Sequence, residues 1–185
     1  MPLDPKLLHT NPMAADVFLG SHKGTILHEI GHYVAANLDG LTCGHIIIPV
    51  DTDRHSGAFV PLDLSAEILC SDPARWSLVS SAGVLAEYHF CGRAMVGAAR
   101  GDFAAYQAVF GLMPEDAIVE RWTRDHLDRI AAHAACIEQN FDRCVYYCNS
   151  NRFLTDNHHV IPSCEMRPPQ QRGLRARLDE AVWTY

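Results

Sequence analysis

Two histidines four residues apart, with a glutamate beside the first, are the clearest chemical signal in this sequence. They lie in His28-Glu29-Ile30-Gly31-His32, the H-E-x-x-H pattern. On a helix, side chains at i and i+4 lie one turn apart on the same face, so both imidazoles can reach one tetrahedral Zn²⁺. The glutamate then projects beside the metal, where it can take a proton from a metal-activated water and pass it to a leaving amine. A shuffled chain of this composition would contain the pattern about 0.03 times.

The pattern leaves the third protein ligand of such a site open. A catalytic zinc site takes three protein ligands and keeps one position for water. The six residues after His32, YVAANL, contain no histidine, so the extension typical of metzincins is absent. Spacing alone leaves Glu67, Glu87, Asp102 and the other histidines as candidates and does not choose among them.

The elements that must position these residues are predicted to be mostly helices. Apolar residues recur with helical spacing from 21 to 38, and Asp39-Gly40 is typical of a helix end. Residues 1–20 are interpreted as a proline-punctuated lead-in with one short helical turn near 14–18. Further helices are predicted at 73–90, 102–110, 114–148 and 174–182, and strands at 44–50 and 57–62. The fold class is therefore α+β, mostly α with a small β-sheet.

Composition predicts a single globular domain spanning 1–185. Of the 185 residues 48% are hydrophobic and 20% charged, which excludes a disordered chain. The net charge of −7 and pI near 5.8 argue against nucleic-acid binding, because an acidic surface repels phosphates. No apolar run is long enough for a membrane span, and the proline-broken N-terminus does not read as a signal peptide. We expect a soluble, cytoplasmic protein.

The seven cysteines do not form a recognisable framework. Their number is odd and no Cys-x-x-Cys pair occurs. Cys144 and Cys148, with a histidine or Cys164 of the tail, could form a second, structural zinc site. The favoured interpretation is that these thiols are buried as small apolar groups.

Four segments carry a further signal: HEIGHYVAA at 28–36, HIIIP at 45–49 with GAF at 57–59, GVLAEYHFCG at 83–92, and GAARGDF at 97–103. In this order they resemble the segments HEAGHALVA, TIIPRG…GYT, GRAAEELFFG and TGASNDL of the peptidase domain of FtsH-type AAA+ zinc metalloproteases. The resemblance covers a motif-bearing core at 22–150, and 150–185 is an irregular tail. It implies an FtsH-peptidase-like helical zincin domain.

The resemblance also assigns roles to individual residues. Asp102 falls on the aspartate that is the family's third zinc ligand, which implies one zinc per chain bound by His28, His32 and Asp102, with Glu29 as the catalytic base. Glu87 falls on a glutamate that is a rival ligand, and a mid-helix carboxylate could instead hold the other ring nitrogen of a histidine. Tyr88 replaces the second glutamate of AAEE, which removes neither a ligand nor the base.

The function predicted on this basis is a zinc-dependent metalloendopeptidase acting on peptides or unfolded proteins. The sequence holds no G-x-x-x-x-G-K-[ST] loop, so we expect cleavage without ATP, with a homo-oligomer or a separate unfoldase as the partner. The segment 57–60 corresponds to the family's edge strand, to which an extended peptide could add. The alternative is a non-proteolytic zinc-containing binding or regulatory module derived from such a peptidase. Glu29 argues against it, because a purely structural site needs no base.

Overall fold

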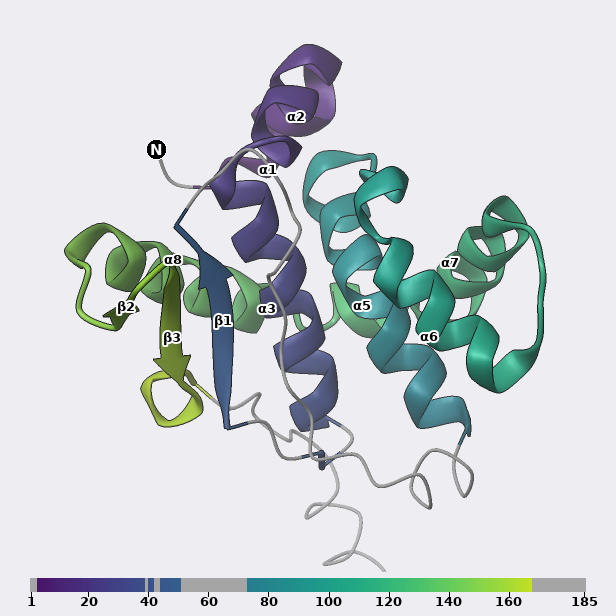
Figure 1. Cartoon of the computed structure of the whole chain (residues 1–185). Helices are drawn as coiled ribbons and strands as arrows, with labels where there is room; N and C mark the ends of the chain where they lie inside the picture. The colour runs from purple at the N-terminus through teal and green to yellow at the C-terminus, as the bar shows by residue number, and fades with distance from the viewer. Residues whose placement is uncertain (1–2, 39, 42–43, 51–72, 168–185) are drawn as a thin grey trace, which may run out of the picture.

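The computed structural model describes residues 3–38, 40–41, 44–50 and 73–167 (Figure 1). These residues form a set of packed helices with a three-stranded antiparallel sheet at one side. The mostly helical α+β class predicted from the sequence is confirmed. The predicted strand at 57–62 and helix at 174–182 lie outside the described residues, as do Asp39 and Glu67.

The first twenty residues are more regular than the sequence analysis expected. They form two short helices, α1 (Pro5–Thr10) and α2 (Pro12–Leu19). Each begins with a capping side chain followed by proline: Asp4 accepts from the backbone N–H of Leu7, and Asn11 accepts from that of Ala14. Proline suits the first helical position because its missing N–H would have no partner there. Pro5 and Pro12, interpreted as interruptions, are therefore helix starts.

Helices α3 (His22–Leu38) and α5 (Pro73–Cys91) pack side by side at the centre of the molecule (Figure 1). Every residue from 24 to 36 of α3 is buried, which is the pattern of a helix surrounded by other elements. Gly40 ends α3 with φ of +71°, and the N–H of Leu41 donates to the carbonyl of Ala36 at 2.8 Å. The motif helix thus ends where the sequence predicts.

The long helix predicted at 114–148 is two helices. After the turn η1 (Val96–Ala98) and α6 (Arg100–Phe110), helix α7 spans Glu115–Ala131 and α8 spans Ala134–Ser150. Helix α7 packs against α5, whereas α8 packs against α3, so the chain changes direction at 132–133. The sequence prediction was wrong here because neither glycine nor proline marks the break and the apolar spacing continues through it.

The sheet consists of β1 (His45–Pro49), β2 (Leu154–Thr155) and β3 (His158–Pro162) in the order β1-β3-β2. Ile47 of β1 is opposite Val160 of β3. The prediction for β1 is confirmed. The tail expected to be irregular supplies the other two strands and the turn η2 (Ser163–Glu165). Burial alternates along β3, with His159 and Ile161 packed inward. No helix of the described part is long and apolar enough to cross a membrane.

Candidate metal centre

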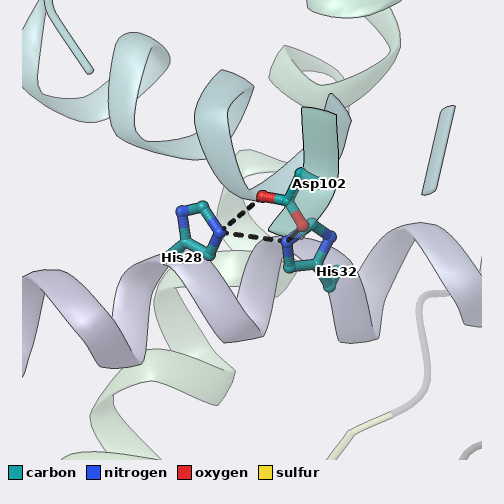
Figure 2. Close-up of side chains that lie close together, drawn as sticks. All are labelled: His28, His32 and Asp102. Carbon is teal, nitrogen blue, oxygen red and sulfur yellow. Dashed lines mark hydrogen bonds and ion pairs between the residues drawn. The ribbon is translucent and has the colours of Figure 1, made fainter. Parts of the chain in front are cut away.

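Three side chains predicted to bind a metal converge at one point between α3 and α6 (Figure 2). Nε2 of His28 lies 3.0 Å from Oδ2 of Asp102, and Nε2 of His32 lies 3.3 Å from Oδ1. The two Nε2 atoms are 3.1 Å apart. All three ligand atoms lie within 4.8 Å of one another, so this group could hold a metal ion.

Both imidazoles are fixed through the ring nitrogen that points away from Asp102. Nδ1–H of His28 donates to Oε1 of Glu87 at 2.9 Å, and Nδ1–H of His32 donates to the carbonyl of Val79 at 2.7 Å. These bonds orient each ring so that Nε2 faces the centre, where it could bind a metal ion in place of a proton. Metal-binding histidines almost always have such a partner on the other nitrogen.

Glu87 is fully buried on α5 and uses both carboxylate oxygens. Its second oxygen, Oε2, accepts the backbone N–H of Met95 at 2.7 Å. Met95 directly precedes η1, which leads into α6 and Asp102. Glu87 therefore connects one imidazole to the segment that delivers the carboxylate, and it is not among the three converging ligands.

Two glycines make this arrangement sterically accessible. A Cβ at Gly83 of α5 would come within 2.5 Å of Nε2 of His28, so only glycine leaves room for this ring. A Cβ at Gly31 of α3 would lie 2.5 Å from the carbonyl oxygen of Ala82. The glycine inside the H-E-x-x-H pattern thus lets α3 approach α5 closely enough for Glu87 and Val79 to reach the imidazoles.

The charges at the centre support one another. Burial alone would raise the pKa of Asp102, but His32 and His28 lower it well below the ordinary range. Burial would likewise lower the pKa of His28 and His32, but hydrogen bonds and charges, chiefly those of Asp102, raise both. In the metal-free chain the centre therefore favours positive charge. Protons on the imidazoles supply this charge, and a metal cation could take their place.

Glu29 follows His28 on α3 and is buried, with 6% of its surface exposed. Burial raises the pKa of this carboxyl group, and the nearby His28 and His32 lower it in part. A carboxylate with a raised pKa holds a proton more readily, which is what a general base at neutral pH requires.

No other candidate ligand among the described residues joins this centre, and Glu67 lies outside them. Within the described residues, His28, His32 and Asp102 are the only three-residue group of His, Cys, Asp or Glu that could hold a metal. Cys144 and Cys148 are free, buried thiols that are hydrogen-bonded to each other, and Cys164 is exposed on η2. The described residues thus give the second, structural zinc no ligand set.

Sequence reasoning missed three contributors: the carbonyl of Val79, the N–H of Met95 and the space at Gly83. Backbone groups have no residue-type signal, so only the fold could reveal the first two. Comparisons with protein-family models, curated proteins and solved structures find no match for this chain. The FtsH-type resemblance therefore rests on the four sequence segments quoted above.

Proposed function

We propose that this chain is a zinc-dependent metalloendopeptidase of the FtsH peptidase type, with a helical zincin fold. His28, His32 and Asp102 hold the zinc, and Glu29 is the catalytic base. The observation that carries the proposal is the convergence of both H-E-x-x-H Nε2 atoms on the Asp102 carboxylate.

The donor set fits zinc. Two imidazole nitrogens and one carboxylate oxygen are ligands that zinc accepts, and three protein ligands leave a fourth tetrahedral position open. Magnesium and calcium prefer oxygen ligands alone. The Asp102 side chain is 21% exposed and the two imidazoles are each 11% exposed, so solvent reaches the centre.

The residues of the chain then divide the work of peptide hydrolysis. A bound zinc would lower the pKa of a water from about 15.7 to about 7 and polarise the peptide carbonyl. Glu29 accepts the proton of the attacking water and returns it to the leaving amine. Glu87 and Val79 keep the imidazoles from rotating. Peptides and unfolded segments are the substrate class, because a folded domain would first have to open locally.

The decisive experiment compares wild type with Glu29→Gln. The amide preserves size but cannot accept the proton, so cleavage of unfolded casein should fall at least about 10²-fold while zinc content stays at one per chain. Glu138→Gln, an exposed change on α8, is the matched control and should keep full activity. Cleavage should not respond to added ATP.

Two results would reject the peptidase proposal. Equal cleavage by wild type and Glu29→Gln would assign the activity to a contaminant. Stoichiometric zinc without cleavage of any unfolded protein in a panel would favour the rival function, a non-proteolytic zinc-containing regulatory module.

A further inference from the structure

Two histidines that the metal centre does not use meet where α3 packs on the sheet. His22 is the first residue of α3, and His159 lies within β3 with 3% of its surface exposed. Their ring centroids are 6.2 Å apart, with the planes at 48°. Nε2 of His22 and Nδ1 of His159 are buried and have no hydrogen-bond partner in the described part of the chain.

Each ring is in surroundings that disfavour a positive charge. Burial lowers the pKa of both histidines, although a hydrogen bond to the carbonyl of Pro49 partly offsets this for His22. A positive charge on His22 lowers the pKa of His159 further. His22 also lies at the N-terminus of α3, where the helix dipole repels cations and the first turn holds no acidic residue.

The neighbouring elements do not supply a compensating negative charge. Asp16 of α2 is bound to Arg93 at 2.7 Å, and Arg143 of α8 donates to the carbonyl of Glu165. The described residues place no carboxylate where it changes the pKa of either ring. The other titratable or charged side chains on the packed elements are Lys23, His28, Glu29, His32 and Tyr33 on α3, His45 on β1, His158 on β3, and Cys136, Glu138, Asp142, Cys144, Tyr146, Tyr147 and Cys148 on α8.

We propose that His22 and His159 form an acid-sensitive junction, closed while both rings are neutral and loosened when one of them takes up a proton. A positive charge on His159 would have no carboxylate partner and almost no solvent, so the sheet would separate from the N-terminal end of α3. Because α3 carries the H-E-x-x-H pattern six residues further on, the junction supports the helix on which the metal centre is built. It does not depend on the proposed peptidase activity.

The sign of the pH effect follows from the neutral folded state. A histidine whose folded pKa is lowered takes up its proton in the unfolded chain first, so stability is lost as the pH falls below the unfolded value of about 6.5. Between pH 7.5 and 5.5, one such histidine raises the unfolding constant by up to about tenfold.

The test compares urea unfolding of the full chain at pH 7.5 and 5.5 for wild type, His159→Phe and His158→Phe. His158 is the matched control because alternation along β3 places it on the opposite face. When the pH falls from 7.5 to 5.5, the unfolding constants of wild type and His158→Phe should rise. This rise should be up to about tenfold greater than the rise for His159→Phe. The metal centre is the same in all three proteins, so its titration cancels in the comparison.

The proposal is overturned if the unfolding constants of wild type and His159→Phe depend equally on pH. It is also overturned if His158→Phe reduces this pH dependence as much as His159→Phe does. If the phenylalanine variant does not fold, His159→Asn replaces it, because an amide restores a neutral polar group near the position of Nδ1. An NMR titration of wild type gives an independent answer. Both rings should titrate below pH 6.5, and a midpoint at or above that value for either ring overturns the junction.

Discussion

At the scale of single residues, two carboxylates meet opposite nitrogens of the same imidazole. Asp102 reaches Nε2 of His28 with a short side chain from the first turn of α6, whereas Glu87 reaches Nδ1 from within α5. An aspartate has fewer rotatable bonds and holds one oxygen firmly at a metal. Replacing Asp102 is therefore expected to affect metal binding differently from replacing Glu87.

We predict that Asp102→Ala loses zinc at concentrations that saturate wild type, because two imidazoles alone remain. Glu87→Gln should keep one site per chain and bind zinc about 10–100-fold more weakly, since its amide cannot accept both N–H groups. Competition with a chromophoric chelator measures both affinities, and exposed Asp128→Ala is the control. Full zinc retention by Asp102→Ala would exclude Asp102 as a ligand and make Glu87 the next candidate.

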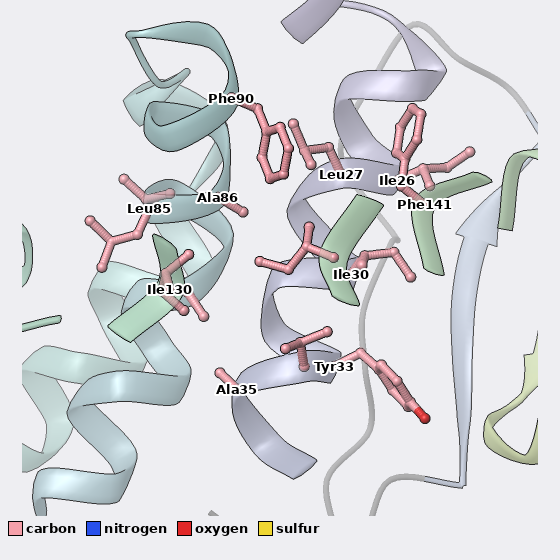
Figure 3. Close-up of a cluster of buried hydrophobic side chains, with 14 of the residues drawn as sticks. Ile26, Leu27, Ile30, Tyr33, Ala35, Leu85, Ala86, Phe90, Ile130 and Phe141 are labelled. Atoms are coloured by element: carbon pink, nitrogen blue, oxygen red, sulfur yellow. The ribbon is translucent and has the colours of Figure 1, made fainter. Parts of the chain in front are cut away.

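At the scale of elements, the close packing of α3 against α5 sets the geometry of the centre. Figure 3 shows Leu27 of α3 beside the Phe90 ring of α5, within a cluster that also includes Ile30 and Ala86. These side chains are nearly fully buried. Such packing is as dense as an organic crystal, so an added methyl group must displace backbone.

We predict that Gly31→Ala destabilises the fold by about 1–3 kcal/mol, because its Cβ would lie 2.5 Å from the carbonyl oxygen of Ala82. Gly101→Ala is the control within α6, where a Cβ meets nothing within 4 Å. The control should be neutral or stabilising by up to about 1 kcal/mol, since alanine favours helices. Urea unfolding of the zinc-loaded proteins measures both, and an unchanged midpoint for Gly31→Ala would mean that the helices can separate without cost.

How far the sequence predicts these elements depends on whether a residue type marks them. Proline and glycine indicate the start of α5 and the end of α3, and the i, i+4 histidines require a helix. The boundary between α7 and α8 lacks such a marker, because Ala132 and His133 are compatible with a continuing helix. Tertiary packing against two different helices decides it. In the same way, motif and resemblance select the side chains of the centre, whereas only the fold supplies its backbone partners.

At the scale of the whole molecule, the proposed zinc would join segments that are remote in sequence. The unfolded chain has the two helical histidines but not the assembled triad, so zinc binds the folded state preferentially. At a free zinc concentration 100 times the dissociation constant, the fold should gain about 2.7 kcal/mol.

We predict that thermal unfolding of the chelator-treated chain shifts upward when zinc is added and returns when chelator is restored. Magnesium at the same concentration should leave the melting temperature unchanged, because the nitrogen ligands do not suit it. His32→Ala is the matched variant and should show no zinc-dependent shift. A zinc effect of equal size in His32→Ala would place the stabilising ion elsewhere.

The 74-residue separation of His28 and Asp102 has a consequence for how a newly made chain would acquire the proposed zinc. A ribosome adds about 5–20 residues per second, so α6 emerges several seconds after α3. During that interval the nascent chain offers only a pair of imidazoles, from which zinc exchanges quickly with competing cellular ligands. Tight binding of the proposed zinc would begin only when α6 docks, so the ion would stabilise a fold that has already formed and would not nucleate folding.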